Sequence, residues 1–203
     1  RRTAGLPPAG RPLRAGCQMI RALCKTAPRE FTQLSRNPDR SVRIGGQNQV
    51  FAPIYGAPFV RDMKGGRRYG DIESFEKLVQ LTYMLPGLHH GGFVTCEPCD
   101  VPVSKRHLDM LYIHMTRSDK PHLGAITEMS RAQDSVDMAE ILFGRDVMEQ
   151  NCGILGYVNN NSPPLVDKVV TEAISTYCAR GPGIIVVPVI LSGAPGPVAG
   201  RRC

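Results

Sequence analysis

Three polar residues recur about 31 positions apart, each directly after a short apolar run. Glu97 follows the first run, Glu128 the second and Asn159 the third. If the runs are parallel strands, these positions lie side by side at the carboxyl ends, and two carboxylates with a carboxamide surround one mouth. Paired carboxylates can serve acid–base chemistry, metal binding or charge balance for a cation. The same residues can equally be helix caps and solvated loop positions, since negative charge is favourable at a helix start.

A second arrangement that could do chemistry is the C-x-x-C pair Cys96 and Cys99, which has the spacing of a zinc or redox site. No second C-x-x-C follows, and His89, His90 and His107 are the histidines that could complete a zinc site. The chain holds seven cysteines, an odd number scattered among apolar segments, which favours reduced thiols over a disulfide framework. We therefore interpret the pair as small apolar thiols near a strand end and predict no metal site.

Four apolar runs are the elements that would position these residues. They predict buried strands at 92–95, 123–126, 153–158 and 184–187, and a fifth strand is expected near 49–52. Helical periodicity predicts a helix over 71–85 and one helix after each of the first three runs. Ser104 is the expected cap of the first of these, and Ser130 with Gln133 forms a capping box for the second. Gly144 and Gly181 are expected to end the second and third.

Alternating strands and helices at this interval predict an α/β fold with a parallel sheet covered by helices. Both a (β/α)8 barrel and an open doubly wound sheet fit the pattern. A barrel typically needs about 250 residues and eight strands, so a 203-residue chain with four or five strands would be a partial TIM-type barrel with about half of the units. No G-x-G-x-x-G follows a strand, which argues against dinucleotide binding.

Charge and hydropathy exclude several function classes. The net charge of +7 comes from the ends, because residues 1–25 carry six basic and no acidic residues and Arg201 and Arg202 add two more. The body is nearly balanced and has no basic stripe, so we predict no nucleic-acid partner. No apolar run approaches the roughly 18 residues that a membrane span needs, and the first residues have no apolar signal core. We therefore expect no membrane association and a cytoplasmic protein.

Several long motifs carry a family resemblance. They are residues 45–70 (GGQNQVFAPIYGAPFVRDMKGGRRYG), 85–109 (LPGLHHGGFVTCEPCDVPVSKRHLD), 118–144 (SDKPHLGAITEMSRAQDSVDMAEILFG) and 159–168 (NNNSPPLVDK). The chain resembles the trimethylamine:corrinoid methyltransferases, a family with pyrrolysine-containing members and members without it, including glycine betaine demethylases. The resemblance implies a (β/α)8 barrel that docks a separate corrinoid protein and transfers a methyl group from a tertiary or quaternary amine to Co(I). It implies that no cofactor is permanently bound in this chain.

The resemblance divides the chain into three parts. Residues 25–198 are the expected partial barrel, residues 1–24 a basic segment that is disordered or outside the family, and residues 199–203 a tail outside the family. We expect a truncated member that transfers no methyl group at a useful rate by itself. Exposed strand edges favour association, so a homo-oligomer is expected. The alternative function is an inactive fragment that only associates with other chains.

Site residues follow from the resemblance together with the strand ends. Methyl transfer to Co(I) is a displacement in which the amine leaves, so the protein mainly aligns the reactants and needs no Ser or Cys nucleophile. Glu97 and Glu128 are predicted as catalytic residues that organise hydrogen bonds or accept a proton. Tyr55 is the predicted aromatic contact of a cationic amine, ahead of Phe59, Phe93 and Tyr157. The remaining predicted substrate contacts are Asn159, Asn160, Asn161 and Ser162, which could hold a substrate carboxylate.

Overall fold

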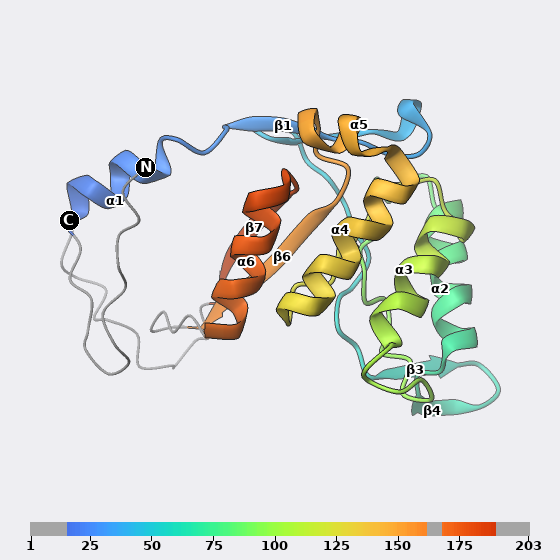
Figure 1. The fold of residues 1–203 in the computed structure, drawn as a ribbon. Coiled ribbons are helices and arrows are strands. Elements are labelled where there is room, and N and C mark those ends of the chain that lie inside the picture. Colours follow the sequence, from blue (N-terminus) through green and yellow to red (C-terminus); the bar gives the residue numbers. More distant parts are fainter. Residues whose placement is uncertain (1–15, 162–167, 190–203) are drawn as a thin grey trace.

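The centre of the fold is a parallel sheet of three strands in the order β5 (Leu123–Gly124), β6 (Leu155–Asn161) and β7 (Gly183–Val189). The structure is a computed structural model, and it describes residues 16–161 and 168–189 (Figure 1). Leu123 pairs with Leu155, and Leu155 pairs with Gly183. The predicted strands at 123–126, 153–158 and 184–187 are therefore confirmed as parallel, although β5 is shorter than expected and β6 runs further.

The predicted strand at 92–95 is wrong. This segment lies beside β5, where the Gly91 amide donates to the Pro121 carbonyl and the Leu123 amide donates to the Gly92 carbonyl, at 2.8 and 2.9 Å. It does not continue as a strand because Gly92 has a φ of 69°, in the left-handed region. A Cβ at Gly92 would lie 2.9 Å from Cγ of Pro53, so the close approach of that loop also requires glycine.

Two antiparallel hairpins precede the sheet. β1 (Glu30–Gln33) pairs with β2 (Val42–Gly45), and β3 (Phe59–Asp62) pairs with β4 (Gly66–Tyr69). A short helix, η1 (Pro38–Arg40), lies in the first hairpin. An isolated bridge from Gln33 to Cys152 sets the end of β1 beside the amino end of β6. The fifth strand predicted at 49–52 is also wrong: Phe51 bonds through its carbonyl to the amides of His89 and His90, and the segment has no ladder partner.

Helices follow the predicted positions, but two of their caps differ. α2 (Ile72–Met84) begins at Asp71, whose side chain accepts the Ser74 amide at 2.8 Å. α3 (Arg106–Arg117) begins at Lys105 and not at Ser104. The Pro102 carbonyl accepts hydrogen bonds from the amides of Lys105 and Arg106, and this turn leads directly into the helix. α4 (Met129–Phe143) begins at Glu128, so Ser130 lies inside its first turn and the predicted capping box with Gln133 is absent from this described helix.

Glycines end two of the helices as expected. Gly144 follows α4 with a φ of 90°, and Gly181 follows α6 (Lys168–Arg180) with a φ of 93°. A short helix, α5 (Arg145–Gln150), then returns the chain to β6. At the other end of the chain, α1 (Cys17–Cys24) extends away from the rest of the fold and has no buried residue (Figure 1).

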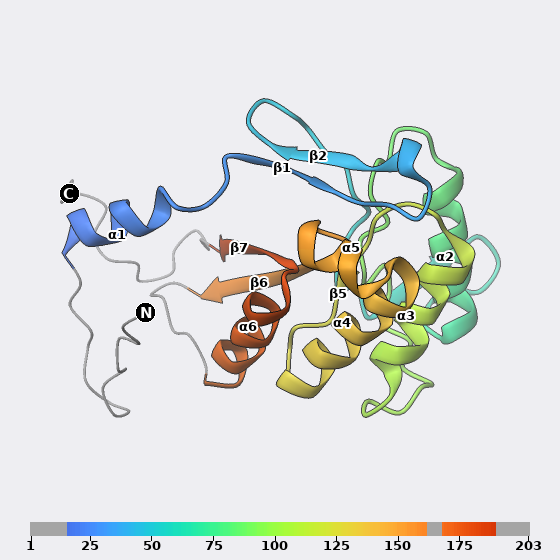
Figure 2. The ribbon, with the colours of Figure 1, turned by 45° about the horizontal axis from the view of Figure 1, so that its top comes forward.

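α4 and α6 cover one face of the sheet, and the β1–β2 hairpin lies on the opposite side of it (Figure 2). The core between sheet and helices contains Gly124, Gly156, Ile154, Val158 and Tyr177, whose side chain is fully buried. Phe75, Leu111, Ala132, Val136, Ala139 and Ala173 extend this core across the helices. Side chains alternate along β6, so Leu155 and Tyr157 point away from Tyr177. The result is an α/β fold whose parallel sheet, in the part described, has three strands and does not close into a barrel.

Candidate functional site

A cavity of about 120 Å³ opens at the carboxyl end of β5. Its walls come from the loop before β3, the segment after Gly92, the first turns of α3 and α4, and the residues that directly follow β5. The lining residues are Tyr55, Phe93, Val94, Glu97, Val103, Arg106, His107, Met110, Ala125, Ile126, Thr127 and Arg131. The cavity is therefore located where a parallel α/β fold places its ligands.

Glu97 lies in this cavity, held by an arginine from the first turn of α3. Arg106 Nη1 donates to Glu97 Oε1 at 2.5 Å, while its Nε and Nη2 donate to the Val101 carbonyl at 3.1 and 2.8 Å. The Arg106 side chain is only 15% exposed, so the pair is partly shielded from water. A charge-assisted hydrogen bond of this kind stabilises by roughly 1.5 to 3 kcal/mol. Glu97 thus enters the cavity with its charge already balanced.

Glu128 is positioned differently, at the rim. It is the N-cap residue of α4, makes no side-chain cap bond, and lies 3.3 Å through Oε2 from Nε of Arg131. Its side chain is 54% exposed, while Arg131 lines the cavity. The structure therefore places both predicted carboxylates near one mouth, and each is paired with an arginine from the following helix.

Tyr55 lines the cavity, and its ring packs against the ring of a second tyrosine. Its ring centroid is 5.3 Å from that of Tyr157 on β6, with the planes tilted by 41°. Although 43% of the Tyr55 surface is exposed, loss of water around the phenol raises its pKa to about 12, with smaller contributions from Tyr157 and Glu97. Tyr55 therefore stays neutral at physiological pH and offers an aromatic face, as a contact for a cation requires.

The asparagines predicted to contact substrate are in β6 and not after it. Asn159, Asn160 and Asn161 pair with Val187, Pro188 and Val189 of β7. Their backbones are thus at the carboxyl end of the sheet, while their side chains and Ser162 lie outside the described part of the chain. The role predicted for these four residues stays a prediction.

His107 forms a close pair with Asp134 at the cavity wall. Its Nε2 lies 2.7 Å from Oδ2 of Asp134, one turn into α4. The residue is 6% exposed, and Nδ1 is buried without a hydrogen-bond partner in the described structure. Buried ring nitrogens normally have a partner, so this one is an exception within the described structure.

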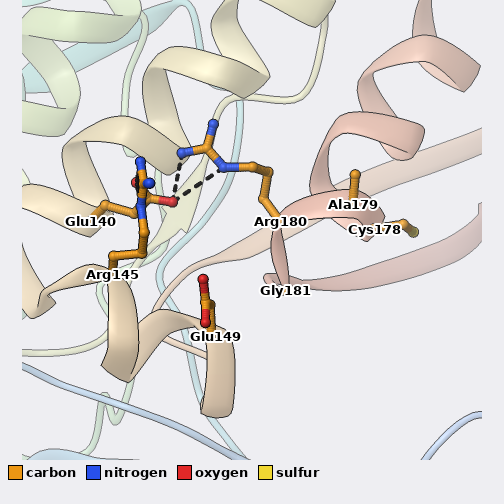
Figure 3. Close-up of a pocket in the computed structure, with 7 residues that line it drawn as sticks. All are labelled: Glu140, Arg145, Glu149, Cys178, Ala179, Arg180 and Gly181. Carbon is orange, nitrogen blue, oxygen red and sulfur yellow. Dashed lines mark hydrogen bonds and ion pairs between the residues drawn. The ribbon is translucent and has the colours of Figure 1, made fainter.

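A larger hollow of about 630 Å³ lies at the opposite end of the sheet, where α4 and α6 end (Figure 3). Arg180 donates through Nε and Nη2 to Glu140 Oε1 at 3.2 and 2.6 Å, and Arg145 approaches Glu140 Oε2 at 3.4 Å. The Arg180 contact lowers the pKa of Glu140, so these charges satisfy one another. Because this end carries the amino ends of the strands, we interpret the hollow as structural and the cavity at β5 as the candidate site.

Comparison with known proteins identifies the family. The chain matches the model of the trimethylamine methyltransferase family over residues 1–201. The chain belongs to this family. It is also 36% identical over 183 residues to glycine betaine methyltransferase of Desulfitobacterium hafniense (strain Y51). That alignment covers 90% of this chain and 38% of the relative, so the chain spans less than half the length of the protein it matches.

Within residues 16–161 and 168–189, no three His, Cys, Asp or Glu side chains are arranged to hold a metal ion. Cys96 is buried, which raises the pKa of its thiol to about 11, and Cys99 is exposed. In the same ranges no helix is both long and apolar enough to cross a membrane.

Sequence reasoning missed three polar side chains of the cavity. Arg106, His107 and Arg131 all lie in the first turns of helices that follow the expected strand positions. The first turn of such a helix faces the same mouth as the strand ends. Their place in a first helical turn could therefore have identified these three residues as part of the cavity. The sequence offers His107 only as a possible zinc ligand, and nothing local to it indicates Asp134, which is 27 residues away.

Proposed function

We propose that this chain is the substrate-binding part of a methyltransferase that moves a methyl group from a tertiary or quaternary amine, such as trimethylamine or a betaine, to the Co(I) of a corrinoid protein. The observation that carries the proposal is the cavity at β5, which combines the aromatic ring of Tyr55 with a charge-balanced Glu97 in a chain of the trimethylamine methyltransferase family. The name of the Desulfitobacterium hafniense relative supports a methylated amine as the substrate.

The electrostatics of the cavity suit the charge change in this reaction. The methylated nitrogen is cationic before transfer, and its charge disappears as the carbon–nitrogen bond breaks. A bare carboxylate beside that nitrogen would stabilise the ground state more than the transition state. Arg106 neutralises Glu97 at 2.5 Å, and a tyrosine face attracts a cation by only about 0.5 to 2 kcal/mol. The cavity can therefore bind the amine without opposing the loss of its charge.

Glu97 and Glu128 are proposed to organise this environment and not to act as nucleophiles. Each holds an arginine that lines the cavity, Arg106 and Arg131. The methyl-accepting Co(I) supplies the nucleophile, so the chain contributes orientation and exclusion of water. Asn159, Asn160, Asn161 and Ser162 remain proposed contacts for a substrate carboxylate, because the backbones of the first three run along the carboxyl end of β6.

The corrinoid is proposed to be carried by a separate partner protein. A cavity of about 120 Å³ suits a small amine and is far too small for a corrinoid ring, so the ring would approach the mouth from outside. In the proposed architecture the parallel strands β5, β6 and β7 are units of a (β/α)8 barrel. The apolar hollow between this sheet and the β1–β2 hairpin, which is lined by Ile44, Leu155 and Ile185, supports association with further chain, including a second copy in a homo-oligomer. We propose a cytoplasmic setting for this catabolic methyl transfer.

A chimera tests the proposed function. This chain replaces the matched segment of the Desulfitobacterium hafniense protein, and the chimera is mixed with a reduced corrinoid protein and either trimethylamine or glycine betaine. We expect an amine-dependent change in the corrinoid absorbance as cobalt is methylated, with the parent protein as positive control. A folded chimera that binds neither amine and methylates no cobalt would contradict the proposal.

A further inference from the structure

The β3–β4 hairpin carries an excess of positive charge on an exposed surface. Residues 59–69 hold one carboxylate and four cations, which are Asp62 and then Arg61, Lys64, Arg67 and Arg68. Arg68 is neutralised, because its side chain lies 3.7 Å from Asp62 and 2.8 Å from Asp71. Within residues 16–161 and 168–189, the other three cations of the hairpin form no ion pair. The hairpin therefore presents three uncompensated positive charges to solvent.

Backbone hydrogen bonds fasten this hairpin beside the mouth of the cavity. The Glu97 amide donates to the carbonyl of Ala57, just before β3, at 2.8 Å. The Cys99 amide donates to the carbonyl of Gly70, just after β4, at 2.9 Å. Glu97 lines the cavity, and Figure 1 shows the hairpin at the end of the fold where α3 begins. The positive charge is therefore held next to the mouth.

Exposed apolar side chains border the same mouth. Val103 lines the cavity, and more than half of its surface is exposed. Ile54, directly before Tyr55, is 74% exposed, and Met129, directly after Glu128, is also more than half exposed. Apolar groups bordered by charged groups match the anatomy of a protein–protein interface, which has an apolar centre and a polar rim. Surfaces that bind nucleic acid are more polar than this one.

We infer that residues 59–69, together with Ile54, Val103 and Met129, form a docking surface for a protein that presents an apolar patch bordered by carboxylates, and that this protein is the methyl-accepting corrinoid protein. The inference rests on the proposed function, in which the corrinoid approaches the mouth from outside. The uncompensated cations of the hairpin attract an acidic partner and orient it toward the mouth. A second copy of this chain fits less well in a symmetric pair, because two identical basic hairpins repel each other.

Charge substitutions in the hairpin test this surface in the chimera described above. Arg61→Glu/Lys64→Glu reverses two exposed charges, whereas Arg61→Gln/Lys64→Gln only removes them and tests the same contact with less disturbance of the turn. Methyl transfer is followed with the corrinoid protein and, separately, with free Co(I) cobalamin, an acceptor that has no protein surface. At low ionic strength we expect the KM for the corrinoid protein to rise about tenfold in the Glu variant and by less in the Gln variant.

Two comparisons show whether the effect belongs to docking. The kcat and the rate with free cobalamin should stay unchanged, and the KM values should converge in about 0.5 M NaCl, because salt screens exposed charges. Lys25→Glu/Arg29→Glu is the matched control, since both residues are exposed and lie in the segment between α1 and β1. That segment is far from the hairpin (Figure 1), so we expect the control to keep the KM of the unchanged chimera.

The outcomes separate this inference from the function beneath it. A rise in KM that is confined to the hairpin variants and removed by salt supports the docking surface. An unchanged KM, or an equal loss of rate with free cobalamin, overturns it and leaves the proposed function standing. Hairpin variants that alter only the oligomeric state or only the binding of a DNA duplex overturn it in favour of those occupants. An unchanged chimera that methylates neither acceptor overturns both the inference and the proposed function.

Discussion

Acid should unfold this protein through three buried histidines that lie together near the amino end of β5. His90, His114 and His122 are almost fully buried, and the rings of His114 and His122 stack with their centroids 5.4 Å apart. His90 Nε2 bonds to Gln33 Oε1 at 3.0 Å, and His114 Nε2 bonds to the Phe93 carbonyl at 2.8 Å. Burial lowers the pKa of His90 to about 3 and of His114 to about 4, and it also lowers the pKa of His122.

The direction of the effect follows from proton uptake. The ordinary histidine pKa is about 6.5, so below this pH the unfolded chain binds protons that the folded chain does not. Stability is therefore fully present above about pH 6.5 and falls as the pH drops toward 4. At pH 5 each histidine removes about 2 kcal/mol from the free energy of unfolding, or about 4 kcal/mol for His90 and His114 together. His122 adds to the loss in the same direction.

Urea unfolding followed by circular dichroism at pH 7.5, 6.5 and 5.0 measures this loss. The carboxylates with lowered pKa, such as Asp71 and Glu140, act only at lower pH, so this window reports the histidines. His114→Gln keeps a donor for the Phe93 carbonyl and should reduce the slope of stability against pH by one proton. His89→Gln is the control, because His89 is exposed. A free energy of unfolding that is constant from pH 6.5 to 5.0, or an unchanged slope in His114→Gln, would refute the reasoning.

Two further substitutions test the core and the cavity. Gly124→Ala should lower the free energy of unfolding by about 1 to 3 kcal/mol in urea titrations, because a Cβ there would contact Tyr177 Oη in a fully packed core. Gly87→Ala has open space and should change little, and equal effects at the two glycines would contradict the packing of α6 on β5. Tyr55→Ala should weaken calorimetric binding of tetramethylammonium by about 0.5 to 2 kcal/mol, whereas Tyr69→Ala, on the β3–β4 hairpin, should not. Unchanged affinity in Tyr55→Ala would remove this ring from the site.

The sequence determined the elements whose signals are local. The interval of about 31 residues gave β5, β6 and β7 with their parallel direction, and the 3.6-residue periodicity gave the helices. Gly144 and Gly181 ended α4 and α6 as expected, because only a residue that tolerates positive φ suits those positions. Long motifs gave the family, and the regular spacing brought Glu97 and Glu128 near one mouth although the segment before Glu97 is not a strand.

The tertiary structure decided what depends on contacts between distant segments. The run at 92–95 is apolar enough for a strand, yet the left-handed Gly92 beside Pro53 prevents one. Periodicity also could not indicate that Arg106 balances Glu97 or that Asp134 orients His107. Those pairs form only after α3 packs against α4 and the segment that holds Glu97, since a side-chain hydrogen bond needs its two atoms placed to within a few tenths of an ångström, which a spacing pattern does not specify. The sequence therefore places the mouth of the site, and packing sets the charge and hydrogen-bonding state of the groups within it.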